Sequence, residues 1–205
     1  MSDLLLIGGG GHCRSCIDLI EAEGRYRIRG IVQPLSDEAD GIFGYPVVGS
    51  DDDLPSLLRE IPQALVTVGQ IRSPEIRIRL YELLKKLGGK LPRIVSPFAY
   101  CSKYAEMGEG TIVMHGAIMN SEASIGANCI INSQALIEHD VIVADHCHIS
   151  TGTRVNGGVT IGRSSFIGSG AILKEGIVIG ENVIIGAGQI VLRDVPSGAV
   201  VKNGQ

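Results

Sequence analysis

The 205-residue sequence is poor in aromatic side chains, in basic clusters and in long apolar runs. It has no tryptophan and only 4% aromatic residues, which argues against a core built around large rings. The net charge is −4 and no dense Lys/Arg run occurs, so neither nucleic acid nor an anionic membrane surface is an expected partner. No stretch reaches membrane-spanning length and no secretory signal opens the chain, so we expect a cytoplasmic protein without a membrane partner.

Cysteines number five, and an odd count in a cytosolic chain favours free thiols over disulfides. Cys129 and Cys147 lie eighteen residues apart and are expected to be small core residues. Cys13 and Cys16 form a single C-x-x-C, and no second pair accompanies it. The motif is therefore only a weak indication of metal or redox chemistry.

What the sequence does contain is a repeat. Twelve aliphatic residues recur at a strict spacing of six: Ile125, Ile131, Ile137, Val143, Ile149, Val155, Ile161, Ile167, Leu173, Ile179, Ile185 and Val191. The position four residues after each is mostly small or β-branched, as a narrow interior requires. This period predicts an all-β left-handed parallel β-helix over residues 96–205, with eighteen residues per triangular coil. Earlier coils are expected at Ile112 and Ile118, with one inserted residue before Ile125.

The first 95 residues have a different pattern, which predicts a small Rossmann-like α/β domain with a parallel sheet. Strands are expected at residues 4–7, 28–32, 64–68 and 93–95. Helices are expected at residues 13–23, at 51–60 with Ser50 or Asp51 as the cap, and from Ser73-Pro74 to Gly88-Gly89.

A glycine loop, Gly8-Gly9-Gly10-Gly11-His12, follows the first strand. It does not fit a dinucleotide site, because Cys13 occupies the third glycine position and Gln33-Pro34 replaces the expected acidic residue. One interpretation is a turn that simply needs a flexible backbone. The other is a phosphate cradle formed by Gly8, Gly10, Gly11 and the helix N-terminus, with His12 touching a pyrophosphate or sugar.

His139 and Asp140 form the strongest catalytic candidate in the repeat. A histidine beside a carboxylate can act as a general base, because the carboxylate fixes the tautomer and stabilises the imidazolium. The alternative is a solvated surface histidine. Gly157 lies eighteen residues later, at the same position one coil on. Its backbone N–H is a candidate oxyanion donor, although a plain corner glycine is equally compatible with the sequence.

His148 lies nine residues after His139, which is one and a half hexapeptides. The two side chains should therefore leave the prism on different sides, and a threefold assembly would bring His139 of one chain towards His148 of the next. His146 is expected to be solvated, and His115 receives no role. No three histidines share one face at coil spacing, so no metal site is expected.

The chain resembles the bacterial sugar acyltransferases that join a small α/β domain to a left-handed β-helix. This family includes UDP-4-amino-sugar N-acetyltransferases and sialic acid O-acetyltransferases. The resemblance covers nearly the whole chain and rests on residues 5–12 (LLIGGGGH), 114–117 (MHGA), 137–140 (IEHD), 148–150 (HIS) and 156–159 (NGGV).

The resemblance implies roles for individual residues. His139 matches the base and Asp140 the residue that orients it. His148 matches a contact to the acetyl end of acetyl-CoA at a subunit interface, and Gly157 matches an amide near the thioester carbonyl. His12 matches a residue of the nucleotide-sugar site. The resemblance also implies a homotrimer with three active sites between subunits.

Three departures from the family pattern stand out. Cys13 replaces a small residue, Gln33-Pro34 replaces an acidic pair that helps hold uridine, and the ending after Val200 lacks the usual Gly-x-Pro-Ala. The sequence as a whole predicts an acetyl-CoA-dependent N-acetyltransferase acting on a UDP-4-amino-sugar. The alternatives are a sialic acid O-acetyltransferase and a trimeric nucleotide-binding scaffold without enzymatic activity.

Overall fold

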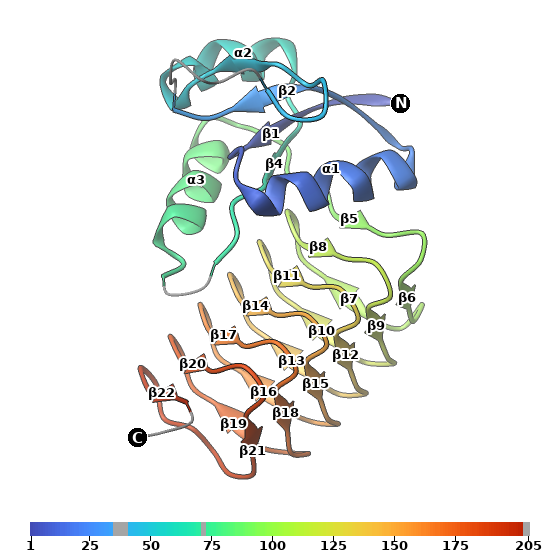
Figure 1. Cartoon of the computed structure of the whole chain (residues 1–205), viewed down its shortest axis with the longest axis vertical. Coiled ribbons are helices and arrows are strands. Elements are labelled where there is room, and N and C mark those ends of the chain that lie inside the picture. The colour runs from blue at the N-terminus through green and yellow to red at the C-terminus, as the bar shows by residue number, and fades with distance from the viewer. Residues whose placement is uncertain (35–40, 71–72, 203–205) are drawn as a thin grey trace. The chain divides into compact units, whose positions relative to one another are not determined.

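A computed structural model describes residues 1–34, 41–70 and 73–202 of the chain (Figure 1). Its contacts divide the chain into two compact units. The first consists of Met1–Gly69 and Glu75–Ile94, and the second of Gln70–Pro74 and Val95–Gln205. The segment Gln70–Pro74 thus belongs with the repeat, although it precedes the last helix of the first unit.

The first unit contains a parallel four-stranded sheet in the order β3-β2-β1-β4. Its strands are β1 (Ser2–Ile7), β2 (Tyr26–Val32), β3 (Val47–Gly49) and β4 (Ala64–Val66). Its helices are α1 (Gly11–Glu23), the 3₁₀ turn η1 (Asp51–Asp53), α2 (Leu54–Glu60) and α3 (Glu75–Lys86). The predicted α/β domain is confirmed, and β3 was missed because its three residues carry no apolar period.

Local signals explain where these elements begin and end. Helix α1 ends at Gly24, whose left-handed φ of 72° lets its N–H bond to the Ile20 carbonyl. Ser50, rather than Asp51, caps the next helical segment, in a reciprocal capping box with Asp53. The continuous burial of strand β1 reflects cover on both faces of a parallel sheet.

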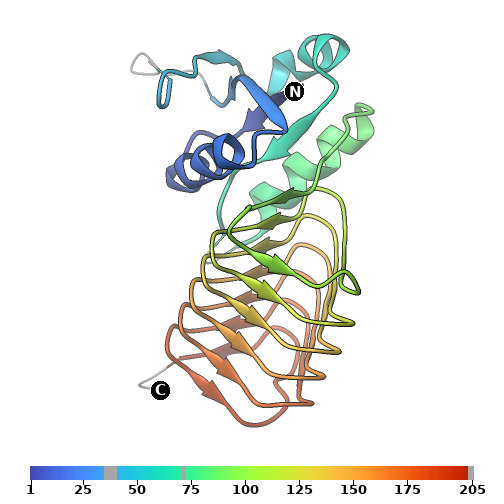
Figure 2. The ribbon, with the colours of Figure 1, turned by 90° about the vertical axis from the view of Figure 1, so that its right-hand side faces the viewer.

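The second unit is the left-handed parallel β-helix, built from three sheets of two-residue strands (Figure 2). The seven-stranded sheet contains β5 (Ile94–Val95), β8 (Ile112–Val113), β11 (Ile130–Ile131), β14 (His148–Ile149), β17 (Phe166–Ile167), β20 (Ile184–Ile185) and β22 (Val200–Val201). The six-stranded sheet contains β6 (Tyr100–Cys101), β9 (Ile118–Met119), β12 (Leu136–Ile137), β15 (Arg154–Val155), β18 (Ile172–Leu173) and β21 (Ile190–Val191). The five-stranded sheet contains β7 (Glu106–Met107), β10 (Ser124–Ile125), β13 (Ile142–Val143), β16 (Thr160–Ile161) and β19 (Val178–Ile179).

The inward column of the solenoid confirms the six-residue period. All twelve aliphatic residues are buried, and none is more than 6% exposed. The prediction of one inserted residue before Ile125 is wrong, because Ile125 pairs with Met107 at the regular spacing of eighteen. The inward positions of the early coils are Met119 and Val113, while Ile118 points outward. The prediction failed because methionine fills a core position that the aliphatic pattern did not count.

The interior also contains a column of side-chain donors at eighteen-residue spacing. Thr111, Cys129, Cys147 and Ser165 each donate a hydrogen bond to the carbonyl fifteen residues further along the chain. These bonds give buried hydroxyl, thiol and carbonyl groups hydrogen-bond partners, which offsets the cost of removing them from water. All five cysteines are free.

The two ends of the repeat depart from the regular coil. The strand expected at 93–95 forms as β5, but it pairs with β8 of the solenoid and not within the α/β sheet. At the other end, Val195 pairs with Ile179 and Val200 pairs with Ile184, so the last coil has sixteen residues, whereas the pairings up to Val191 span eighteen. Of the atypical ending, residues 203–205 lie outside the described residues.

Candidate functional site

The catalytic candidates lie at the corner between β12 and β13. Ile137 ends β12 with its side chain in the core, and the next three residues turn towards solvent. Asp140 adopts a left-handed φ of 59°, a conformation that recurs at this corner position throughout the solenoid. Aspartate tolerates this region better than most residues, so the corner can carry a carboxylate where other coils have glycine.

His139 and Asp140 form a hydrogen-bonded pair at 2.7 Å between Nδ1 and Oδ2. The carboxylate accepts from the Nδ1–H, so the lone pair of Nε2 is available as a base. Hydrogen bonding to Asp140 raises the pKa of His139, and the charges of Asp140 and Glu138 add to this shift. About two thirds of each side chain is exposed, at 65% and 64%, so a substrate can reach the imidazole.

Gly157 is required at its position by the imidazole of His139. A Cβ on Gly157 would lie 2.7 Å from Cε1 and 2.8 Å from Nε2 of the ring. Its φ lies outside the left-handed region, whereas Gly158 next to it has a φ of 70°. The left-handed φ therefore favours glycine at position 158, although other corners hold non-glycine residues there, whereas the ring requires glycine at position 157. Among the described residues, the Gly157 N–H has no main-chain acceptor, so it is available to a ligand oxygen.

A second carboxylate, that of Glu138, lies beside the pair and was not predicted to take part in the site. Glu138 accepts a hydrogen bond of 2.8 Å from the side-chain amide of Asn120, one coil earlier. This bond holds the Glu138 carboxylate at the corner, where its charge contributes to the raised pKa of His139. The eighteen-residue spacing of Asn120 and Glu138 is the sequence signal that could have identified the contact.

His148 lies on β14 in the seven-stranded sheet, whereas His139 lies at the corner between the other two sheets. The two histidines are therefore on different sides of the prism. His148 is 6% exposed, with Nδ1 2.8 Å from the Gln70 carbonyl oxygen and Nε2 3.2 Å from the Asn132 amide nitrogen. The contact between His148 and acetyl-CoA stays a prediction.

The expectation that His146 is solvated is wrong. Its side chain is 2% exposed and its Nδ1 lies 3.0 Å from the side-chain amide of Asn128, one coil earlier. His115 is also bonded within the chain, with Nδ1 2.6 Å from the Ser96 hydroxyl. The eighteen-residue spacing of Asn128 and His146 is again the sequence signal that could have identified their contact, whereas Ser96 and His115 are nineteen residues apart and do not follow the coil period.

The glycine loop joins β1 to α1 in the first unit. Gly8 has a φ of 106°, and a Cβ there would lie 2.3 Å from a Val68 methyl group. The Thr67 hydroxyl donates a 2.6 Å hydrogen bond to the Gly8 carbonyl and so fixes the turn. Gly10 and Gly11 have open space on their Cβ side, and α1 has no side-chain cap. This arrangement leaves the helix N-terminus accessible to an anion.

His12 and Gln33 border this loop. Burial, together with the nearby charge of Arg77, lowers the pKa of His12 to about 4. His12 is therefore neutral near pH 7 and would contact a phosphate or sugar as a hydrogen-bonding group, not as a cation. The Gln33 side chain lies against Gly9, where an added Cβ would be 1.8 Å from its Oε1. The amide that departs from the family pattern thus lies directly on the loop.

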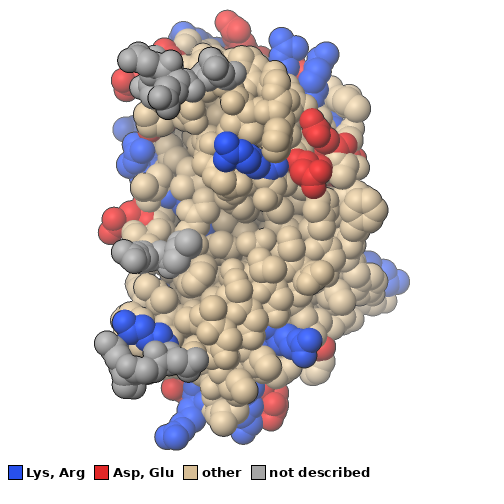
Figure 3. Space-filling model, in the orientation of Figure 1, with Lys and Arg blue, Asp and Glu red and all other residues tan. Residues whose placement is uncertain are grey.

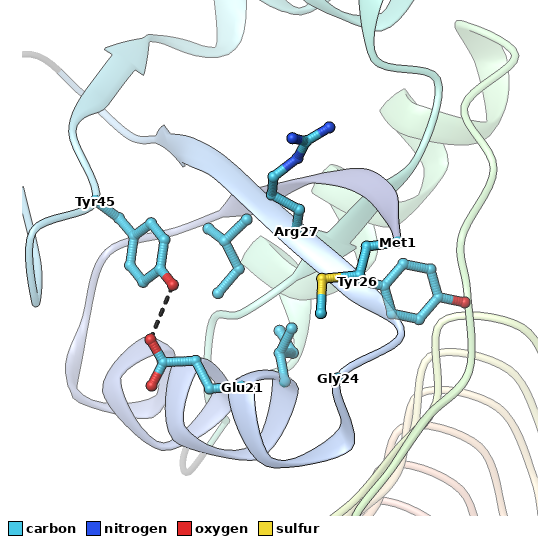
Figure 4. A pocket seen from close by; sticks show the side chains of 8 residues that line it. Met1, Glu21, Gly24, Tyr26, Arg27 and Tyr45 are labelled. Carbon is cyan, nitrogen blue, oxygen red and sulfur yellow. Dashed lines mark hydrogen bonds between the residues drawn. The ribbon is translucent and has the colours of Figure 1, made fainter.

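A separate pocket of about 240 Å³ opens at the other end of α1 (Figure 4). Tyr26, Tyr45 and Glu21 line it, and the Tyr45 hydroxyl donates a 2.8 Å hydrogen bond to Glu21. Because the glycine loop precedes the start of α1 and Glu21 lies near its end, this pocket is distinct from the candidate anion site.

Within the described residues, the remaining features that bear on function are the distribution of surface charge, the grouping of metal-ligating side chains and the apolar character of the helices. On the face shown in Figure 3, basic and acidic side chains are scattered and form no continuous basic patch. Within residues 1–34, 41–70 and 73–202, no three His, Cys, Asp or Glu side chains cluster as metal ligands would. None of the helices in that part of the chain combines the length and apolar character of a membrane span.

Comparisons with known families and sequences agree with the two-part architecture. The family model described as the PglD N-terminal domain matches residues 3–84. The model of the bacterial transferase hexapeptide, with six repeats, matches residues 158–188. None of the curated proteins matches the chain.

Solved structures with similar folds extend over nearly the whole chain. The acetyltransferase domain of PglB from Neisseria gonorrhoeae, in complex with acetyl coenzyme A, is 32% identical at a TM-score of 0.90, covering 97% of this chain and 94% of that one. A GDP-perosamine N-acetyltransferase from Caulobacter crescentus, solved with CoA and GDP-perosamine and with one histidine replaced by alanine, is 33% identical at a TM-score of 0.90, covering 98% and 93%. WeeI from Acinetobacter baumannii, at 22% identity and a TM-score of 0.80, shows the fold alone. At this identity over nearly its full length, the chain belongs to the hexapeptide-repeat family of bacterial sugar acyltransferases.

Proposed function

We propose that the protein transfers an acetyl group from acetyl-CoA to the amine of a nucleotide-linked amino sugar. The observation that carries the proposal is the His139 imidazole, held by Asp140 at 2.7 Å and seated over Gly157. The pair supplies a base, and the adjacent N–H supplies an oxyanion donor. The relatives from Neisseria and Caulobacter, solved with acetyl coenzyme A and with CoA and GDP-perosamine, support the choice of both substrates.

The proposed mechanism is direct transfer. The amine nitrogen of the sugar attacks the thioester carbonyl carbon while Nε2 of His139 removes a proton from that nitrogen. Asp140 stabilises the imidazolium, and the Gly157 N–H donates to the oxyanion of the tetrahedral intermediate. Collapse breaks the carbon–sulfur bond, and the imidazolium returns its proton to the leaving thiolate, giving the amide and CoA.

The acceptor class follows from the glycine loop. An accessible helix N-terminus beside Gly10 and Gly11 suits a diphosphate, and the neutral His12 suits a hydrogen bond to phosphate or sugar. We propose a UDP-4-amino-sugar as the first candidate. A GDP-linked sugar is the second, because Gln33 replaces the acidic pair associated with uridine and because the Caulobacter relative was solved with GDP-perosamine.

A homotrimer with shared active sites is part of the proposal. The six-stranded sheet presents an outward row that is largely apolar and exposed, including Tyr100 at 60% and Ile190 at 67%. Exposed apolar rows of this kind favour association. Because His139 and His148 leave the prism on different sides, a site that uses both requires two chains.

The test compares acceptors and one base variant. CoA release is followed with UDP- and GDP-linked 4-amino-sugars and with free sialic acid, and the product is identified by mass. We expect turnover with a nucleotide sugar and a fall in kcat of at least about 10²-fold in His139→Ala. Arg163→Ala is the matched control, because Arg163 is exposed at the same position of its own hexapeptide.

Three outcomes would change the proposal. Near-normal turnover in His139→Ala would remove the base. Faster acetylation of sialic acid, without competition from UDP or GDP, would favour the O-acetyltransferase. Calorimetry that detects no binding of acetyl-CoA would favour the scaffold without activity.

A further inference from the structure

Gln70 is a buried residue in hydrogen-bond contact with His148. It belongs to the same compact unit as the solenoid and is 3% exposed. Its side-chain Nε2 donates a 3.2 Å hydrogen bond to the Ser164 carbonyl. Its own carbonyl oxygen lies 2.8 Å from Nδ1 of His148. One residue thus anchors itself to a corner of the solenoid and presents an acceptor to the imidazole.

The donors and acceptors in the hydrogen bonds of His148 with Gln70 and Asn132 follow from the chemistry of each group. A main-chain carbonyl can only accept, so His148 must be protonated on Nδ1. On the other side of the ring, Asn132 places its amide nitrogen 3.2 Å from Nε2. The orientation of that amide is set by its Oδ1, which accepts a 2.8 Å hydrogen bond from the Ser133 N–H. Because an amide nitrogen only donates, Nε2 of His148 must be the acceptor and carry no proton.

The ring itself is held in place. Phe166, one coil later, meets the imidazole edge-on with ring centroids 5.3 Å apart and an interplanar angle of 80°. A buried ring with both nitrogens bonded and one edge packed has little freedom to flip. The neutral Nδ1–H tautomer is therefore the form that satisfies the hydrogen bonds with Gln70 and Asn132.

We propose that Gln70 is a positioning residue which, together with Asn132, holds His148 as the neutral Nδ1–H tautomer. Its importance for catalysis rests on the proposed function and on the contact between His148 and the acetyl end of acetyl-CoA that the family resemblance implies. A neutral His148 of this tautomer has no N–H left for the thioester oxygen, so the Gly157 amide is the oxyanion donor. It also carries no positive charge that would oppose formation of the imidazolium on His139 of a neighbouring chain.

The first experiment measures the tautomer directly. The ¹⁵N resonances of the His148 ring, assigned by comparison with His148→Ala, distinguish protonated from unprotonated nitrogens near pH 7. We expect one protonated nitrogen, Nδ1, in the unaltered protein. A ring protonated on Nε2, or on both nitrogens, would overturn the proposal. No substrate is needed, so this result is independent of whether the proposed acetyl transfer is correct.

The contributions of Gln70 and Asn132 to the tautomer of His148 are tested with one variant of each residue. Gln70→Ala removes the anchor to Ser164, and we expect a mixture of tautomers together with a rise of about tenfold in the KM for acetyl-CoA, as loss of a buried hydrogen bond would give. The KM for the nucleotide sugar should not change. Gln63→Ala is the control, because no side-chain hydrogen bond of Gln63 occurs within the described part of the chain. An unchanged ¹⁵N spectrum in Gln70→Ala would refute the positioning role.

Asn132→Asp keeps the proposal testable if Gln70→Ala does not fold. A carboxylate opposite Nε2 accepts a hydrogen bond instead of donating one, so we expect both ring nitrogens of His148 to become protonated. Asn182→Asp introduces the same charge at an exposed corner and should leave the ring unchanged. If His148 stays singly protonated in Asn132→Asp, Asn132 does not control its protonation. If the tautomer shifts in either variant without any change in the acetyl-CoA kinetics, the catalytic relevance is refuted.

Discussion

Replacing Gly157 by alanine is the sharpest test of the corner geometry. The added Cβ would lie 2.7 Å from Cε1 and 2.8 Å from Nε2 of His139. The van der Waals contact distance between non-bonded carbon atoms is about 3.5 Å or more, so the ring must move by roughly 0.7 Å. The backbone itself does not resist the change, because the φ of Gly157 lies outside the left-handed region.

The displacement acts on a short hydrogen bond. The His139–Asp140 contact is 2.7 Å, and a shift of this size takes it towards or beyond the limit of about 3.2 Å for a good N–H···O bond. Misplacing a catalytic group by about 1 Å can cost about 10²-fold in rate. We therefore expect kcat to fall by about 10- to 10²-fold in Gly157→Ala, with a melting temperature close to that of the unaltered protein.

Two comparisons make the assay specific. In the His139→Ala background there is no ring to displace, so adding Gly157→Ala should cause no further loss of acetyl transfer. Gly158→Ala should behave in the opposite way. Its φ of 70° makes alanine cost about 1–2 kcal/mol, and its Cβ would meet nothing closer than 3.9 Å. That variant should lose several degrees of melting temperature but keep most of its turnover.

The reasoning fails if Gly157→Ala turns over within about threefold of the unaltered protein. It also fails if the loss is the same with and without the His139 imidazole. Either result would mean that Gly157 is present for the backbone turn and not to make room for the His139 imidazole.

Three further predictions concern other parts of the molecule. Asp140→Asn should lower kcat by less than His139→Ala does. Because hydrogen bonding to Asp140 raises the pKa of His139, the acid limb of the kcat/KM profile should move to lower pH in Asp140→Asn; an unmoved limb would contradict the pairing. His12→Gln should flatten the loss of stability on acidification. The folded pKa of about 4 lies below the unfolded value near 6.5, so stability falls as pH drops between them, by on the order of 3 kcal/mol, measured as denaturant midpoints. Mixing inactive His139→Ala and His148→Ala chains, with subunit exchange, should restore some activity at a solution mass of three monomers; a fully active monomer would exclude the shared site.

The fold was largely accessible from the sequence because the solenoid is a one-dimensional structure. Each coil contacts only its neighbours, so a strict spacing of six translates directly into an inward column, and the column of aliphatic residues is buried as expected. The pattern failed where a core position was filled by another residue type. Met119 and Met107 continue the period, and the outward Ile118 displaced the predicted register by one residue.

The geometry of the candidate catalytic corner was partly accessible from the sequence for the same reason. A spacing of eighteen placed Gly157 one coil above His139, and the clash of an added Cβ with the ring agrees with that placement. The sequence could not decide why the glycine is there. Only the backbone angles separate Gly158, whose left-handed φ favours glycine, from Gly157, which the imidazole requires.

The burial of His146 and His148 was decided by tertiary structure, although the spacing of eighteen between Asn128 and His146 was visible in the sequence. His146 was expected in solvent and is buried against Asn128, and His148 is bonded to Gln70, seventy-eight residues earlier in the chain. Periodicity determines which side of a coil a residue occupies, because that depends only on local backbone geometry. It does not determine what covers that side, since the covering residue comes from a distant segment whose position is set by packing and hydrogen bonding.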